Sequence, residues 1–329
     1  MRMRALSLIG GAFVALSTSI ASAQANQEGQ SAEYPTRTIK FVLPFPPGSG
    51  TDQAARAAAN YIALATGQSV IVENKPGANG LIAAQQAAQA DPDGYTVFIT
   101  SMTTQSVNPF LYKNLPYDPV KDFIPVAMLS QNAMVLVVRN QPDQPKSVDE
   151  LTTRLKGSAK KLNFASGNTS SLIAAETYRN IVAGSAVHIP YKGIPQAMID
   201  LLGGTVDFMF SDLTVATPVV QQGRARALGV TGSKRASTFP DVPTMSEAGV
   251  PIELTIWNGA YVPAGTPAPV VARLNELLNN ATQTEEAKQR FRQTGGSVIA
   301  MSPEEFKKFN EREIEIWRKA VQKAGIQPE

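Results

Sequence analysis

The sequence predicts an α/β protein built from two doubly wound units, and three observations support this prediction. Short apolar strands alternate with helices across short turns, the pattern of a parallel sheet covered on both faces. The alternation pauses in the Pro-, Tyr- and Asp-rich segment 111–121 and then resumes. The chain has 329 residues, more than one domain usually needs, so two domains or one large α/β unit are expected.

The first 23 residues have the parts of a secretory signal peptide. Two arginines form a basic end, an apolar run follows, and an A-x-A sequence ends at Ala23, after which we expect cleavage. A membrane anchor is the alternative, but the apolar run is too short to span a bilayer. Residues 24–33 are small and polar, which predicts a disordered mature N-terminus before order begins near Tyr34.

Composition narrows the range of functions. Removal of the signal takes away two arginines and no acid, which lowers the formal charge from +3 to +1, so a pI near 9 does not indicate a nucleic-acid partner. The chain has no cysteine, which excludes a lipid-attachment cysteine, disulfides and thiolate metal sites. We expect an exported monomer with no cofactor and no metal.

The first unit is expected to hold three strands with a helix after each of the first two. Small apolar residues at helical spacing from Ala54 to Ala65 give the first helix one apolar face, and Gly67 ends it. The expected elements are strand 39–44, helix 52–66, strand 70–73, helix 81–90 and strand 95–100.

The second unit is expected to start after residue 129 and to continue the same alternation. A capping box at Ser147 to Glu150 begins its first helix. Strand 124–129 leads up to this unit. The expected elements of the unit are strand 133–138, strand 162–165, helix 172–182, strand-like run 187–190, helix 195–202, strand 206–210, loop 211–214 and strand 226–230.

The end of the chain is expected to rejoin the first unit. An extended run, 254–262, returns to it, and two helices follow, from Thr266 to Asn280 and from Ser302 to Gly325. The domains are therefore placed at 34–129 plus 257–329 for the first and 130–256 for the second.

The stretch 44–52 joins the first strand to the first helix, at the kind of strand end where open α/β sheets bind ligands. Proline and glycine hold the turn open, while Ser49, Thr51 and the first free N–H groups of the helix can donate hydrogen bonds to an anion. A plain connection with Thr51 or Asp52 as helix cap is the alternative. The turn 166–171 repeats the pattern in the second unit, and a polar helix cap is again the alternative.

Residues that would form a catalytic set are scarce. Residues 48–53 lack the third glycine of a dinucleotide fingerprint, and neither a Walker-type loop nor a G-x-S-x-G sequence occurs. The single histidine, His188, lies in a strand-like run, which favours a structural role over a catalytic base or metal ligand. Hydroxyl- and glycine-rich loops at strand ends favour binding over turnover, because helix N-termini and neutral donors can hold a carboxylate without a buried arginine.

A series of short motifs is spread in order over the whole mature chain. They are YP at 34–35 with the run 39–52, VENKPGANG at 72–80, DPDGYT at 91–96, YDP at 117–119, DFIPV at 122–126, PYKG at 190–193, LLGG at 201–204, RALGV at 226–230 and FPDVPT at 239–244. Together they resemble the Bug proteins, the extracytoplasmic solute receptors of tripartite tricarboxylate transporters.

The resemblance implies a type II periplasmic-binding-protein fold, with two doubly wound α/β domains joined by a two-crossover hinge and an interdomain ligand cleft. It implies that a carboxylate is held, often with ordered water, by the loop 46–52 and by loops of the second domain. The residues matched to ligand binding are Phe45, Pro47, Gly48, Ser49, Gly50, Thr51, Asp52, Ser101, Thr103, Thr104, Ser166, Asn168, Thr169, Ser170, Tyr191, Lys192 and Asp212.

The chain departs from the family pattern at two places. The family often has a glycine where Ser49 stands and a histidine soon after the turn at Ser166, where this chain offers hydroxyls. The identity of the ligand therefore transfers less well than the fold. Asp52 and Asp212 would repel a bare carboxylate, so we expect them to act through caps, water or a donor group of the ligand.

The function implied by the resemblance is that of a periplasmic receptor and not an enzyme. It would close on a small organic carboxylate and deliver it to the membrane permease subunits of a tripartite tricarboxylate transporter. The expected ligand is a di- or tricarboxylate, or an aromatic dicarboxylate such as terephthalate with Phe45 and Tyr191 as aromatic walls. The alternative is a periplasmic receptor that signals to a membrane sensor kinase. A secreted hydrolase is less favoured, because only His188 could supply an imidazole base.

Overall fold

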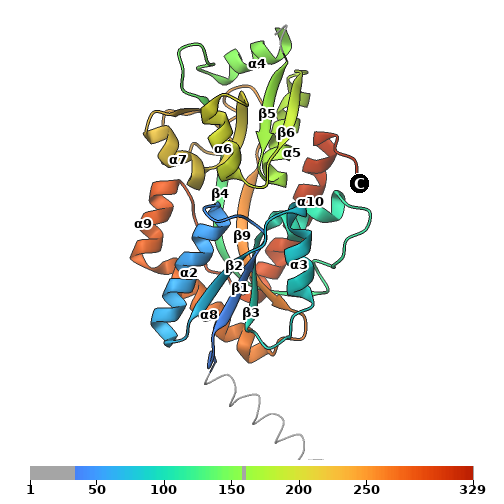
Figure 1. Ribbon diagram of the computed structural model, residues 1–329, viewed down its shortest axis with the longest axis vertical. Helices are drawn as coiled ribbons and strands as arrows, with labels where there is room; N and C mark the ends of the chain where they lie inside the picture. Colours follow the sequence, from blue (N-terminus) through green and yellow to red (C-terminus); the bar gives the residue numbers. More distant parts are fainter. Residues whose placement is uncertain (1–33, 158–160, 329) are drawn as a thin grey trace, which may run out of the picture.

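The computed structural model describes residues 34–157 and 161–328. The expected signal peptide, its cleavage site at Ala23 and the segment 24–33 lie outside the described residues. The described chain forms two lobes, one above the other in Figure 1. The long strand β4 (Phe123–Arg139) runs from one lobe into the other, and β9 (Thr255–Pro263) lies antiparallel beside its first part. These two strands are therefore the connection between the lobes.

The first lobe is built on the strand order β2-β1-β3-β9-β4, in which β1 pairs in parallel with both β2 and β3. Gly67 ends its first helix in the left-handed conformation, as the sequence predicts. Its elements are β1 (Ile39–Leu43), α2 (Gly50–Thr66), β2 (Val70–Asn74), η1 (Ala78–Gly80), α3 (Leu81–Ala88), β3 (Thr96–Ser101), η2 (Thr103–Val107) and η3 (Asn108–Phe110).

The second lobe is built on the strand order β4-β7-β5-β6, with β8 on the other side of β4. β5 pairs in parallel with β6 and β7, so helices cross over between them. Its elements are α4 (Val148–Gly157), β5 (Leu162–Ser166), α5 (Thr169–Ile181), β6 (Ala186–Pro190), α6 (Ile194–Gly203), β7 (Phe208–Asp212), α7 (Leu213–Gln221) and β8 (Ala225–Val230).

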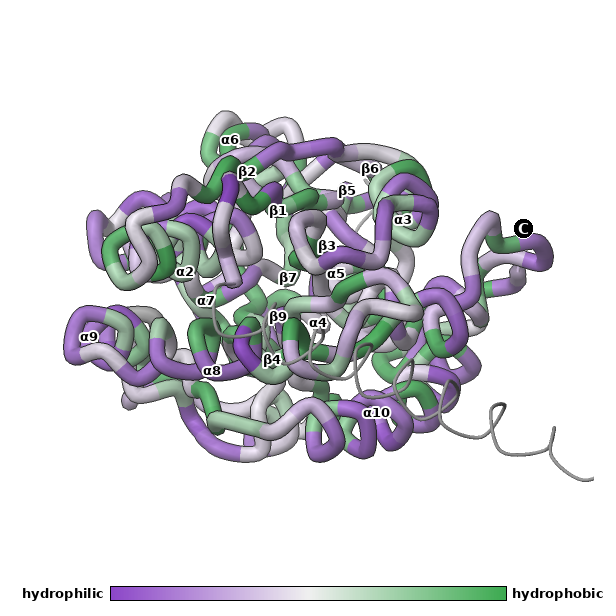
Figure 2. Tube along the Cα trace, turned by 90° about the horizontal axis from the view of Figure 1, so that it is seen from below, coloured by the Kyte–Doolittle hydropathy of each residue, from purple (hydrophilic) through white to green (hydrophobic). Residues whose placement is uncertain are grey.

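Three helices follow β9: α8 (Ala268–Gln283), α9 (Glu285–Thr294) and α10 (Pro303–Ala324). α10 begins at the capping box of Ser302 and Glu305, with proline in its first turn, and ends at Gly325, as predicted. It packs against η2 of the first lobe and α5 of the second. Figure 2 shows its hydrophilic residues on the outside of the molecule. α10 therefore contacts both lobes.

The α/β class with two lobes is confirmed, and several local predictions are corrected. The sheet is mixed, because β9 and the second half of β4 pair antiparallel with their neighbours. The two strands expected at 124–129 and 133–138 form the single strand β4, whose ladder shifts register at two irregularities instead of stopping. The predicted loop 211–214 is wrong: it is the end of β7 and the start of α7. The domain limits stay a prediction.

Apolar side chains fill each lobe on both faces of its sheet. One cluster lies beneath α2 and α8 in the first lobe, another beneath α6 and α7 in the second, and the largest extends from α3 through α10 to α5. Trp257 and Trp317 are fully buried in this largest cluster. Within residues 34–157 and 161–328, no helix is long and apolar enough to cross a membrane.

Candidate ligand-binding site

An enclosed cavity lies between the two lobes. The first lobe contributes the turn between β1 and α2, the end of β3 and the start of β9, and the second contributes the starts of α5, α6 and α7. The cavity volume is about 20 Å³, which is room for one water molecule, so the lobes must part to admit a larger ligand. The lining residues are Phe45, Pro46, Ser49, Thr51, Ser101, Met102, Gly167, Asn168, Ser170, Gly193, Ile194, Asp212, Ile256, Trp257 and Asn258.

Four helices begin at the wall of this cavity. Ser49 caps α2, Asn168 caps α5, Gly193 precedes α6 and Asp212 precedes α7. The first N–H groups of a helix have no partner inside the helix and carry a partial positive charge of roughly half a unit. Helix starts from both lobes therefore face one space, an arrangement that suits an anion without a buried cation.

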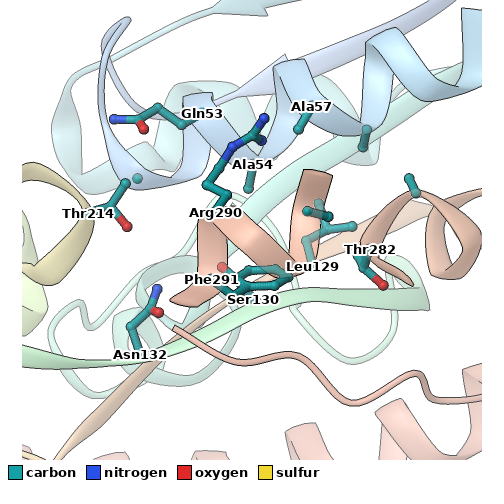
Figure 3. Close-up of a pocket in the computed structure, with 14 residues that line it drawn as sticks. Gln53, Ala54, Ala57, Leu129, Ser130, Asn132, Thr214, Thr282, Arg290 and Phe291 are labelled. Atoms are coloured by element: carbon teal, nitrogen blue, oxygen red, sulfur yellow. The ribbon is translucent and has the colours of Figure 1, made fainter. Parts of the chain in front are cut away.

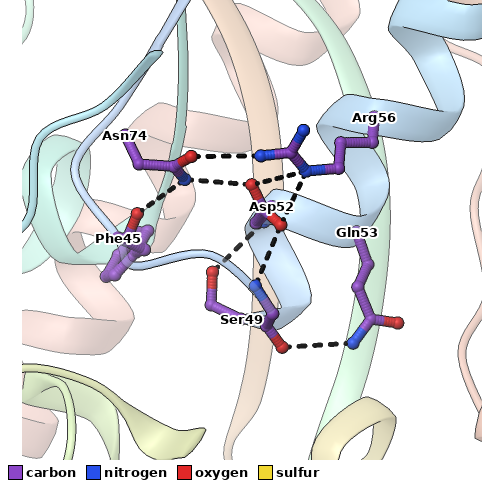
Figure 4. Close-up of polar contacts among 7 residues, drawn as sticks. Phe45, Ser49, Asp52, Gln53, Arg56 and Asn74 are labelled. Carbon is purple, nitrogen blue, oxygen red and sulfur yellow. Dashed lines mark hydrogen bonds and ion pairs between the residues drawn. The ribbon is translucent and has the colours of Figure 1, made fainter. Parts of the chain in front are cut away.

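The turn before α2 is held from behind by Asp52, as Figure 4 shows. The Asp52 carboxylate accepts hydrogen bonds from the Gly48 N–H at 2.9 Å, from Asn74 Nδ2 at 2.9 Å and from Arg56 Nε at 3.0 Å. Asn74 also donates to the Phe45 carbonyl at 2.9 Å. Burial would raise the pKa of Asp52, but these hydrogen bonds outweigh it and lower the pKa. Asp52 thus braces the turn and does not line the cavity.

Replacing Asp52 with alanine is expected to lower the free energy of unfolding by about 2 kcal/mol, because three donors lose their acceptor. The pKa of Asp52 is lowered on folding, so its stabilising contribution is complete above the ordinary value of 3.8 and is lost as the pH falls below it. Urea unfolding at pH 7 and at pH 3 measures both effects. Asp52→Asn should lie between wild type and Asp52→Ala. Equal stability of Asp52→Ala and wild type at pH 7 would contradict this role.

Asn258 ties the cavity wall to the connecting strands. The Thr51 hydroxyl donates to Asn258 Oδ1 at 2.5 Å, and Asn258 Nδ2 donates to Ser130 Oγ at 2.8 Å. Sequence reasoning did not select Asn258 or its neighbours Ile256 and Trp257. The sequence did contain a signal for Asn258, because an asparagine stands within the apolar run that was predicted to return to the first unit.

Trp257 is oriented by a buried acid on α10. Its indole N–H donates to Glu313 Oε2 at 2.9 Å, and the indole of Trp317 donates to the same oxygen at 3.1 Å. Glu313 is buried, which raises its pKa, although the two indole hydrogen bonds oppose the shift. The two tryptophans of the chain therefore share one acceptor, and one of them lines the cavity.

In the second lobe, Asn168 forms the polar part of the wall. Its Oδ1 accepts from the Ser171 N–H and from the Ser170 hydroxyl, both at 2.9 Å, in a capping box. α5 therefore starts at Thr169, three residues earlier than the sequence predicts. This turn both caps α5 and forms part of the cavity wall, because Asn168 and Ser170 also line the cavity.

Asp212 is the one ionisable side chain among the described residues that line the cavity. It ends β7 and is 8% exposed. Burial raises the pKa of Asp212 to about 6, and a hydrogen bond with the Asn168 side chain opposes this rise only in part. Its Oδ1 has no hydrogen-bond partner among the described residues. A buried acid with an unused acceptor therefore belongs to the wall of the cavity between the lobes.

A second hollow, of about 260 Å³, adjoins the cavity at Phe45, Gly167 and Asn168. Tyr191, Lys192 and Thr103 line this hollow and not the inner cavity. The Tyr191 hydroxyl donates to Asp200 at 2.7 Å, which fixes the ring. The predicted aromatic walls therefore lie apart, with Phe45 at both spaces and Tyr191 only at the outer one.

The predicted site residues thus fall into three groups. In the inner cavity the structure brings together Phe45, Ser49, Thr51, Ser101, Asn168, Ser170 and Asp212, and at the outer hollow it places Thr103, Tyr191 and Lys192. The side chain of Thr104 bonds Thr100 inside the first lobe, and that of Ser166 bonds His188. Seven predicted residues line neither space: Pro47, Gly48, Gly50, Asp52, Thr104, Ser166 and Thr169. A ligand-binding role of these residues stays a prediction.

Ser166 and His188 form the pairing that a hydrolase would need, at 2.6 Å between Oγ and Nε2. Ser166 is 5% exposed, and the His188 ring stacks on Phe164. Burial lowers the pKa of His188. Neither residue lines the cavity or the hollow, so a substrate held there would not reach the serine. The geometry favours the structural role expected of this histidine.

Another cavity, of about 40 Å³, lies behind the start of α2, between β4, α8 and α9 (Figure 3). Alanine side chains, Leu129 and Phe291 form its apolar part, and its polar part includes Gln53, Asn132 and Arg290. Arg290 at its edge pairs with Glu286 at 3.3 Å.

Two lobes joined by crossing strands, with a polar cavity between them, define a solute-binding protein. A family model described as the tripartite tricarboxylate transporter family receptor matches residues 54–326. This match covers most of the chain. The chain therefore belongs to this family of periplasmic solute-binding receptors, as its motifs indicate.

Solved structures agree with this assignment. The periplasmic binding protein BugD is 34% identical, with a TM-score of 0.85 over 90% of this chain and 100% of its own. Rpa4515 of R. palustris, solved with adipate, is 30% identical, with a TM-score of 0.86 over 90% and 100%. MatC of Rhodopseudomonas palustris, solved with bound malate, is 32% identical, with a TM-score of 0.82 over 88% and 100%. The type II periplasmic-binding-protein fold is thus confirmed.

Proposed function

We propose that this receptor captures a small organic carboxylate in the interlobe cavity and delivers it to the membrane permease subunits of a tripartite tricarboxylate transporter. The convergence of four helix N-termini from two lobes on one enclosed space supports the proposal most strongly. The lining side chains offer hydroxyl and amide donors in addition, and no covalent step is needed.

The proposed ligand carries two or three carboxylates. The inner cavity takes one of them, and the adjoining hollow leads from Phe45 to the exposed ammonium of Lys192, which would attract a second. Relatives with adipate and malate support the dicarboxylate class. An aromatic dicarboxylate such as terephthalate remains in the proposed class, with Phe45 as one wall.

Binding of acids can be measured by thermal unfolding and by tryptophan fluorescence, since one of the two tryptophans lines the cavity. Adipate, malate, citrate and terephthalate form the panel, and the neutral diamide of adipic acid is the matched control. A ligand at a hundred times its dissociation constant adds about 2.7 kcal/mol, which raises the melting temperature by a few degrees. The diamide should shift neither signal. Failure of every acid to change either signal would overturn the proposal.

Delivery to the permease needs a separate measurement. Uptake of the labelled acid by membrane vesicles that contain the permease subunits should depend on added receptor. Tight binding without receptor-dependent uptake would leave capture supported and rule out delivery to that permease.

A further inference from the structure

Asp212 has a geometry that carboxylate capture alone does not explain. It stands at the N-cap position of α7, yet its side chain makes no capping hydrogen bond. A β-carbon built on Gly50 would lie 3.2 Å from Asp212 Oδ2, so the absence of a side chain at Gly50 gives the acid room against the start of α2. The acid is therefore packed between the lobes and not displayed to solvent.

One oxygen of this acid is unused. The Asn168 side chain hydrogen-bonds the carboxyl group, but Oδ1 is buried and has no partner among the residues the structure describes. A buried acceptor without a donor is unfavourable, and a ligand that enters the space lined by Asp212 when the lobes part can supply the donor. No Lys, Arg or His lies among the described residues of that wall to supply it.

A plain dicarboxylate cannot satisfy this oxygen. Its ionised groups are acceptors only, and each would place a second negative charge near Asp212. A hydroxyl or an ammonium group beside the ligand carboxylate would reverse both effects. It would donate to Asp212, while the carboxylate turns to the helix N-termini of the same wall.

We propose that Asp212 selects ligands with a hydrogen-bond donor next to the carboxylate, that is, hydroxy- or amino-carboxylates over their unsubstituted analogues. This inference rests on the proposed function and narrows it. Asp212 Oδ1 is the recognising atom, Asn168 holds the carboxyl group in place, and Gly50 provides the room. The specificity of the receptor then resides in an acid, while its affinity for carboxylates resides in neutral donors.

The test compares ligands that differ by one group. Isothermal titration calorimetry at pH 7.5 is run with succinate, malate and aspartate, and in a longer series with adipate and 2-aminoadipate. The substituted acid of a series should bind wild type about 10- to 100-fold more tightly than the plain one. Malate and aspartate distinguish a hydroxyl from an ammonium donor.

Two variants assign the preference to Asp212. In Asp212→Ala the ratio between substituted and plain acid should fall to about 1 to 3, and Asp212→Asn, which keeps one neutral acceptor, should lie between. The ratio is read within one variant, so a general loss of folded protein does not change it. Asp241→Asn, an exposed acid of the same lobe, is the matched control and should keep the wild-type ratio.

The outcomes separate this inference from the proposed function. If plain and substituted acids bind wild type equally well, or if Asp212→Ala keeps the preference, the role of Asp212 is wrong and carboxylate capture stands. Tighter binding of the plain acid than of the substituted acid would likewise show that the role of Asp212 is wrong. If no acid of either series binds, both proposals fail together.

Discussion

Gly193→Ala is expected to weaken ligand binding by about 10- to 100-fold while leaving the unliganded protein nearly as stable as wild type. A β-carbon at Gly193 would lie 2.3 Å from Cγ of Pro46, well inside van der Waals contact. Gly193 precedes α6 in the second lobe, and Pro46 belongs to the turn before α2 in the first. The clash therefore acts only when the two lobes meet around the cavity.

The size of the effect follows from the cost of overpacking, about 1–3 kcal/mol, because the rigid proline ring cannot turn aside. Backbone strain does not contribute, since Gly193 has φ −175°, an extended conformation that alanine also adopts. As an N-cap, alanine is less favourable than glycine by about 1 kcal/mol, which is the small loss of stability expected in the unliganded protein. The variant thus separates closure of the cavity from folding of each lobe.

Titration calorimetry and unfolding of the unliganded protein measure the two quantities. Gly203→Ala is the matched control, because it lies at the other end of α6 and a β-carbon there meets nothing within 4 Å. Wild-type affinity in Gly193→Ala would show that the lobes need not approach as closely as in this structure to hold the ligand. A large loss in Gly203→Ala would point instead to an effect on α6.

Glu313→Ala is expected to lower the free energy of unfolding by about 3–5 kcal/mol, the largest stability effect we predict. The substitution removes the acceptor of two buried indole N–H groups, those of Trp257 and Trp317, and leaves a cavity where α10 packs on β9. Because Trp257 lines the ligand cavity, affinity should fall as well. Glu313→Gln keeps an acceptor oxygen and should lose less stability.

The pH dependence of unfolding provides an independent check. Burial raises the pKa of Glu313 above 4.5, so the folded state binds a proton that the unfolded state has already lost. Stability should therefore decline as the pH rises from 4.5 through the higher pKa of the folded protein. Glu313→Gln should make that decline smaller, while the part that comes from the raised pKa of Asp212 remains. Exposed Glu311 on the same helix is the control, and Glu311→Ala should leave the stability unchanged within about 0.5 kcal/mol. An equal loss in both variants would contradict the shared-acceptor role.

Elements with strong local signals were predicted well from the sequence. The glycine at 67 and the Ser302 capping box set helix ends through backbone groups only a few residues away, and both are found in the structure. α7 and α9 were missed. α7 contains Pro218 and several β-branched residues, and α9 is strongly polar, so neither has the apolar periodicity that identifies a helix.

Some members of the site could not be found in this way. Asn258 and Trp257 become part of the wall only because β9 passes between the lobes beside β4, over a hundred residues away in the chain. Conversely, Asp52 and Thr104 stand in the expected loops, but hydrogen bonds to neighbouring elements turn their side chains away from the cavity.

The sequence by itself determined the α/β class, the loops at the strand ends and the receptor family, because these follow from local patterns and spaced motifs. The tertiary structure alone decided that four helix starts meet at one cavity, that Asp212, with an unused oxygen, lines it, and that Gly193 lies against Pro46. The physical reason is that contacts between the lobes depend on how two sheets pack across β4 and β9. Local propensity does not encode that packing.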